Sequence, residues 1–135
     1  MNNVIVKTAV KTLIVIIFAV GIAACVLCFG FPKTVAGIGE KTGNYSMAVT
    51  FASIQYTYTG SIEDLARCAE DSILSENDEN IVKYCEKLME DESFEEYCEQ
   101  RSGKIDLGDL KVVINYRQFI ENNLNSAKTR LQING

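Results

Sequence analysis

The chain has 135 residues, with 13 Lys and Arg, 18 Asp and Glu, no His, no Trp and a formal net charge of −5. The lack of His excludes His-based catalytic triads and His-ligated zinc sites, and the negative net charge disfavours general nucleic-acid binding. A chain of this length holds one small domain besides any membrane segment.

The N-terminal part of the sequence predicts a helix that crosses a membrane. A short basic tail over 1–11 carries Lys7 and Lys11, and an uncharged run of 20 residues extends from Thr12 to Phe31. As a helix, such a run rises about 30 Å, which matches the apolar thickness of a bilayer. We therefore expect a single transmembrane helix over 12–31, with the lipid bilayer as its partner.

Two kinds of processing stay open for this segment. Cleavage of a signal peptide after Thr34-Val35-Ala36 is one alternative, although a signal peptide has a shorter apolar region. Lipid modification is the other, because Ile22-Ala23-Ala24-Cys25 resembles a bacterial lipobox. An uncleaved span is favoured over both because the apolar run continues well past Cys25.

The charges that flank the span give its orientation. Lys7 and Lys11 precede the apolar run, and Lys33 and Lys41 follow it, so the positive charges are nearly balanced. A short tail with two Lys and no acid favours a cytoplasmic N-terminus. We expect the acidic domain to lie on the outer side.

The region after the span is predicted to be a linker followed by helices. Residues 32–43 contain three Gly and indicate a juxtamembrane linker, so the domain is expected over 44–135. Residues 44–59 fit both a helical and a strand period. A helix is favoured there because the segments that follow are helical, and a lone strand would have no partner.

Two amphipathic helices come next in the chain. Ser61 provides a helix cap, and the apolar positions of the first helix leave the charged ones outward. Asn77 caps the second. The first helix is predicted to bury Ile62, Leu65, Ala66, Ala69 and Ile73 and to expose Glu63, Arg67, Glu70 and Asp71; the second is predicted to bury Ile81, Cys85 and Leu88.

The C-terminal third is predicted to contain a short helix, a loop and a long helix. The short helix begins after Ser93 and points Phe94 and Tyr97 inward, and the loop covers 103–108. The long helix opens at Asp109. Its apolar stripe consists of Val113, Tyr116, Ile120, Leu124, Ala127 and Leu131. The predicted fold is all-α: one transmembrane helix followed by a small domain of antiparallel helical hairpins.

Charge is divided unevenly between the two parts of the domain. Residues 63–99 hold fourteen acids and three bases, whereas 101–135 hold six bases and three acids. We expect the last helix to lie against the acidic block. The bases available for this are Lys111, Arg117, Lys128 and Arg130.

A repeat-like pattern connects two parts of the domain. The run from Gly43 to Ala48, followed by Phe51-Ala52, resembles the second helix of a tetratricopeptide-type repeat. At an offset of 33 residues, Ile81 corresponds to Ala48 and Cys85 to Ala52. The resemblance covers about one and a half units, and the order of segments also resembles small single-pass bacterial membrane proteins of unassigned role. It implies a scaffold of helical hairpins that binds proteins.

The functional expectation is a membrane-anchored scaffold or adaptor that mediates protein–protein interaction, with an unknown partner or a second copy of itself. Tyr56, Tyr58 and Tyr116 are the candidate partner-binding residues, with core packing as their alternative role. The alternative function is a membrane-tethered sensor that binds a divalent cation or small ligand through its acidic helices. The acids in question are Glu90, Asp91, Glu92, Glu95 and Glu96.

The residue inventory favours no catalytic centre. Cys68 and Cys85 lie on apolar faces, which is typical of small core residues. Cys98 lies among acids, which raise a thiol pKa and disfavour a nucleophile. We expect no enzymatic activity, no cofactor and no nucleic-acid partner.

Overall fold

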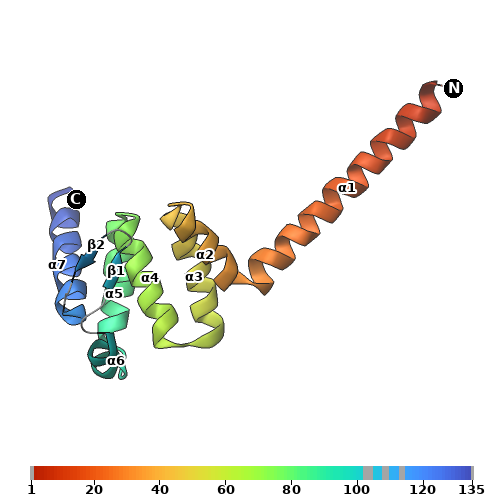
Figure 1. The fold of residues 1–135 in the computed structure, drawn as a ribbon. Helices are drawn as coiled ribbons and strands as arrows, with labels where there is room; N and C mark the ends of the chain where they lie inside the picture. The colour runs from red at the N-terminus through yellow and green to blue at the C-terminus, as the bar shows by residue number, and fades with distance from the viewer. Residues whose placement is uncertain (1, 102–104, 108–109, 113–114, 135) are drawn as a thin grey trace.

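The structure, a computed structural model, describes residues 2–101, 105–107, 110–112 and 115–134. Its first element is α1, Asn2–Gly30, which projects from the rest of the chain as one rod (Figure 1). The stretch Val4–Gly30 is long and apolar enough to cross a membrane, and none of its apolar window is buried. The predicted basic tail is therefore part of this helix from Asn2 onward.

Helix α2, Pro32–Lys41, replaces the predicted linker. Pro32 starts the helix with a backbone angle that already suits it, and only Phe31 separates it from α1. The three Gly were interpreted as signs of a flexible linker, but Gly39 is a packing residue. A Cβ on Gly39 would lie 2.9 Å from the backbone N of Ala48, so only Gly allows this close contact with the next helix.

Helices α3, Tyr45–Thr59, α4, Ile62–Leu74, and α5, Asp78–Met89, continue the array. Each helix packs against the next in chain order, and the short turns between them make neighbours antiparallel (Figure 1). The helical interpretation of 44–59 is confirmed. The all-α prediction, with a long apolar helix followed by packed helices, is also confirmed, apart from one short hairpin of strands described below.

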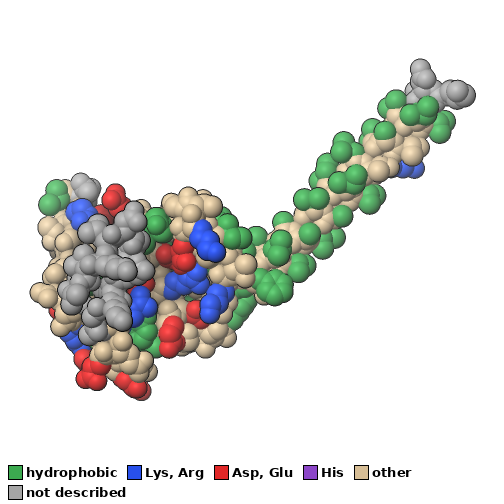
Figure 2. Space-filling view, in the orientation of Figure 1, with side chains coloured by type: hydrophobic (Ala, Val, Ile, Leu, Met, Phe, Trp, Pro, Cys, Tyr) green, Lys and Arg blue, Asp and Glu red, His purple; other side chains and the backbone are tan. Residues whose placement is uncertain are grey.

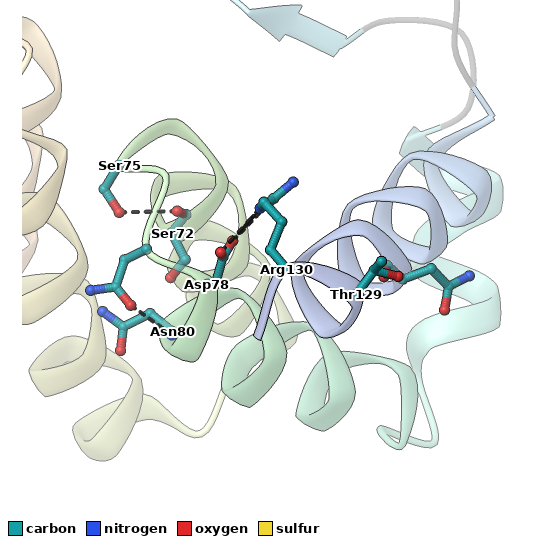
Figure 3. Close-up of polar contacts among 8 residues, drawn as sticks. Ser72, Ser75, Asp78, Asn80, Thr129 and Arg130 are labelled. Carbon is teal, nitrogen blue, oxygen red and sulfur yellow. Dashed lines mark hydrogen bonds and ion pairs between the residues drawn. The ribbon is translucent and has the colours of Figure 1, made fainter. Parts of the chain in front are cut away.

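The α2–α3 and α4–α5 hairpins share one turn at an offset of 33 residues. The side chain of Asn44 accepts a hydrogen bond from the backbone N–H of Met47, and Asn77 accepts one from Asn80 in the same way. The residue before each Asn has a positive φ, 72° at Gly43 and 55° at Glu76. Figure 3 shows the second of these turns, in which the Ser75 hydroxyl also donates to the Ser72 carbonyl.

The two turns also share the backbone hydrogen bond that closes the first helix of each hairpin, α2 and α4. The N–H of Asn44 donates to the carbonyl of Gly39 at 2.8 Å, and the N–H of Asn77 donates to that of Ser72 at 3.4 Å. This pattern is a helix C-terminal motif that ends in a left-handed residue. The domain therefore contains two copies of one helix–turn–helix geometry.

The chain after α5 departs from the predicted loop and helix start. Helix α6, Phe94–Arg101, is followed by the strands β1, Ile105–Leu107, and β2, Leu110–Val112, which pair antiparallel. Helix α7, Tyr116–Asn134, begins well after Asp109, the predicted start. Its cap is Asn115, whose side chain accepts from the N–H of Gln118. The predicted stripe position Val113 lies outside the described residues.

Helix α7 packs against α5 and covers that end of the array. Arg130 pairs with Asp78 at 2.6 Å (Figure 3), and Lys128 pairs with Glu86 at 2.6 Å. Arg117 pairs with Glu95. The prediction that the basic final helix lies against the acidic block is confirmed for these three bases, and Lys111 belongs to β2.

The core lies between α4, α5, α6 and α7, where large apolar side chains replace the small ones of the first hairpin. The predicted inward positions of α4, α5 and α6 are buried except Ile62 and Ile73, which are partly buried, whereas Leu131 at the end of the α7 stripe is exposed. The largest fully buried apolar side chains are Tyr116, Phe94, Leu65, Ile81, Leu88 and Ile120.

Candidate partner-binding groove

The three candidate tyrosines lie in three different settings. Tyr58 on α3 has 59% of its surface exposed. Tyr56 is half-buried, with the Lys87 ammonium 4.7 Å from its ring centroid. Tyr116 is fully buried, and its hydroxyl donates to Glu70 at 2.9 Å. The structure does not bring the three together, and Tyr116 offers no surface to a partner in this conformation.

A polar groove of the domain lies elsewhere, across α2, α4 and α6. It is a groove of about 630 Å³ to which α3 contributes one side chain. In Figure 2, acidic and basic side chains gather over α2 and α4. The groove is lined by Lys33, Glu40, Tyr45, Glu63, Asp64, Arg67, Glu70, Asp71, Leu74, Tyr97, Gln100 and Arg101.

Two ion pairs cross the floor of the groove and join its three helices. Arg67 on α4 donates to Glu40 on α2 at 2.5 Å, and Arg101 on α6 donates to Glu70 on α4 at 2.6 Å. The hydrogen bond with Glu40 raises the pKa of Arg67, which stays charged. Because each pair connects different helices, the groove is held in shape by its own lining.

Asp71 is one of two residues of this lining, with Arg101, that keep a buried polar atom without a hydrogen-bond partner among the described residues. Only 3% of its surface is exposed, and its Oδ2 accepts no hydrogen bond from any donor in the described part of the chain. Burial, reinforced by the neighbouring Glu40 carboxylate, raises the pKa of Asp71 to about 7. Burying a carboxyl group whose Oδ2 makes no hydrogen bond costs stability.

The outward assignment of the α4 charges holds for Glu63 alone, since only 22% of the Arg67 side chain is exposed in its pair with Glu40. Asp71 is buried, and Glu70 is largely covered because it accepts from both Arg101 and the Tyr116 hydroxyl. Burial raises the pKa of Glu70 and raises that of Tyr116 strongly. Sequence reasoning missed the groove because it treated every charge on α4 as solvated.

A signal for Asp71 was present in the sequence. Asp64, Cys68 and Asp71 follow one another at steps of four and three, so they share one side of the helix. Cys68 lies on the apolar stripe and is buried. The two Asp must therefore border the core, and both are buried.

The cysteines of the domain have properties of packing residues. Burial raises the pKa of Cys68 and of Cys85 to about 12, which leaves both thiols protonated at neutral pH. Burial and Glu121 raise the pKa of Cys98 as well. The prediction that Cys68 and Cys85 are small core residues is confirmed.

The acidic helices form no recognisable cation site in the described residues. Within that part of the chain, no three Asp, Glu, Cys or His side chains lie close enough together to hold a metal ion. Of the acids from Glu90 to Glu96, Glu95 is engaged by Arg117 instead.

Comparison of the chain with protein-family models, with curated protein sequences and with solved structures gave no match.

Proposed function

We propose that this protein is a membrane-anchored helical interaction module, in which α1 crosses the bilayer and the groove of α2, α4 and α6 receives a segment of another protein. The observation that carries the proposal is the groove itself, with the buried carboxyl of Asp71 in its lining, whose Oδ2 has no hydrogen-bond partner among the described residues. Structural cores avoid such a group. A ligand that donates a hydrogen bond or a positive charge would satisfy it.

The arrangement of the hairpins supports this proposal. The groove is lined mainly by α4, with further residues from α6 and from α2; α2 and α4 are the first helices of the two equivalent hairpins. Arrays of helical hairpins of the tetratricopeptide type present extended binding surfaces in this manner. The turn shared by the two hairpins at an offset of 33 residues is close to the repeat length of about 34 residues in that type.

The charges in the groove define the chemistry of its partner. Five acids and three bases line it, so the lining is acidic overall. Two of the three bases, Arg67 and Arg101, are already paired with acids of the lining. We propose that the partner presents a basic segment, whose Lys or Arg side chains compete for Glu40, Glu70 and Asp71.

The basic residues near the N-terminus support one orientation in the membrane. Lys7 and Lys11 lie at the start of α1, and no acid accompanies them in the tail. By the positive-inside rule, we propose a cytoplasmic N-terminus and a domain on the outer side.

Photocrosslinking in native membranes tests the groove. A photoreactive amino acid replaces Gln100, which lines the groove, or Gln132, an exposed residue on α7 outside its lining. We expect a crosslinked product from position 100 and none from position 132, and loss of that product when Glu63→Lys is added. Equal crosslinking from both positions, or none from position 100, would contradict the proposal. The mass of the product separates a different protein from a second copy of this chain.

A further inference from the structure

We propose that the outward face of α2 lies on the surface of the bilayer that α1 crosses, so that the domain is seated on the membrane instead of being tethered at a distance. This inference rests on the proposed anchoring by α1. The outward face consists of Phe31, at the start of α2, and Thr34, Ile38 and Lys41 within it.

The first argument is the short connection between the two helices. Helix α1 ends at Gly30 and α2 begins at Pro32. The N–H of Phe31 still donates to the carbonyl of Leu27 at 3.1 Å, and its own carbonyl accepts from the first turn of α2. With no free linker and a rise of about 1.5 Å per residue, every residue of α2 lies within about 15 Å of the end of the span.

The second argument is the direction of α2. Figure 1 shows that α2 turns sharply away from the axis of α1 instead of extending it. If α1 crosses the bilayer, a helix that turns in this way runs along the surface. Its residues then stay near the headgroups over their whole length.

The third argument is which side chains face outward. Pro32, Ala36 and Gly39 are buried, and Gly39 contacts α3. The opposite side carries Phe31 and Ile38, which have 57% and 51% of their surfaces exposed. These two positions are seven residues apart and therefore lie on one side of the helix. Large apolar side chains at the water–lipid boundary insert among the headgroups, as in interfacial amphipathic helices.

Charge makes the bilayer a better occupant of this face than another protein domain. Lys41 is exposed beside Ile38 and can reach the phosphate layer, whereas the one acid of α2, Glu40, turns into the groove and binds Arg67. The array also has one covered and one open end. Helix α7 packs on α5 at one end, whereas α2 forms the other end of the array, next to α1, and packs on α3 (Figure 1).

The absence of Trp from the sequence gives a direct test. Three full-length variants each carry a single Trp: Phe31→Trp, Ile38→Trp and Glu99→Trp. They are reconstituted in vesicles that contain phosphatidylcholine brominated on its acyl chains, which quenches Trp fluorescence only at close range. Glu99 is exposed on α6, which Figure 1 shows on the far side of the domain from α1.

We expect the Trp at position 31 and the Trp at position 38 to lose most of their fluorescence, and the one at position 99 to keep it. Quenching at position 31 without quenching at position 38 would overturn the inference and leave the anchoring intact. No quenching at position 31 would overturn the anchoring itself. Equal quenching at all three positions would also overturn the inference, because it would mean that the domain does not rest on α2.

Discussion

The α2–α3 and α4–α5 hairpins have the same turn but different interiors. Both turns end in a positive-φ residue and an Asn cap, and both close with the same backbone hydrogen bonds. The first hairpin buries small residues, among them Ala36 and Ala48. The second buries larger residues at two equivalent positions, Ile81 where the first has Ala48 and Cys85 where it has Ala52, whereas Ala69 matches Ala36.

This difference shows that two features of the sequence act separately: the residues that set the backbone path and the residues that set the packing volume. Caps and left-handed residues fix the path of the backbone, and side-chain volume fixes how closely the helices approach and how much apolar surface they bury. The first hairpin brings α2 close to α3. The second supplies the large side chains of the core. Each of the following variants tests one of these features in the full-length protein, by urea unfolding in a mild detergent followed by circular dichroism.

The largest effect is expected from Leu65→Ala in the second hairpin. Leu65 is fully buried, so its truncation leaves a cavity and should lower the free energy of unfolding by about 2–5 kcal/mol. Leu74→Ala is the matched control in the same helix, because Leu74 is 40% exposed. Similar losses in both variants would show that the core does not lie where the structure places it.

A smaller loss is expected from Gly39→Ala in the first hairpin. The new Cβ would lie 2.9 Å from the backbone N of Ala48, so the two helices must separate. Overpacking of this kind costs about 1–3 kcal/mol. Ser72 occupies the equivalent position in the second hairpin, where a Cβ is already accommodated. Ser72→Ala removes one hydrogen bond to the carbonyl of Cys68 and should cost less than about 1 kcal/mol.

The relative size of these two effects tests the close approach directly. If Gly39→Ala is as mild as Ser72→Ala, α2 does not contact α3 as tightly as the structure shows. A Gly39→Ala protein that loses the Arg67–Glu40 pair as well would show that the same contact shapes the groove.

Periodic, capped segments were predictable from the sequence, and exceptions to periodicity were not. The inward face of α4 followed from Leu65 and Ala69 because apolar side chains at helical spacing report burial directly. Helix α2 was missed because its Gly residues pack instead of bending the chain. Strand β1 was missed because 103–108 was predicted as a loop, and β2 was missed because Val113, ahead of Tyr116, continues the helical period of α7.

The groove was the least predictable part, and for a physical reason. Charged residues are normally solvated, so their identity predicts exposure unless a partner is known. The partners of Glu70 are Arg101 and Tyr116, which lie 31 and 46 residues further along the chain. Contacts at this separation depend on the packing of α6 and α7 and leave no local pattern.

A pH-dependent effect is expected from Asp71→Asn in the second hairpin. The pKa of Asp71 rises from its ordinary value of 3.8 to about 7 in the folded state. The folded protein therefore holds a proton that the unfolded chain releases between these values, and the free energy of unfolding falls as the pH rises from about 4 to about 7. Asp71→Asn should remove most of this fall, because Asn has no proton to release.

The comparison of Asp71→Asn with the unmodified protein at pH 5 and pH 8 checks the sign. The variant should gain relative stability at pH 8, where the unmodified protein carries the buried charge. Some fall should remain in the variant because burial also raises the pKa of Glu70. An unchanged pH profile would place the carboxyl of Asp71 in water.

The smallest effects are expected from exchanging the left-handed residues of the two turns. Glu76 has a φ of 55°, which is strained for a residue with a Cβ, and its counterpart Gly43 has a φ of 72° without strain. Glu76→Gly should therefore raise the free energy of unfolding by up to about 1 kcal/mol, and Gly43→Ala should lower it by about 1 kcal/mol. Glu76→Ala removes the charge but keeps the Cβ, so it should change little. A gain in Glu76→Ala equal to that in Glu76→Gly would assign the effect to the charge of Glu76. The positive φ at position 76 would then carry no measurable cost for a residue with a Cβ, and the two turns would differ in backbone energetics despite their common hydrogen bonds.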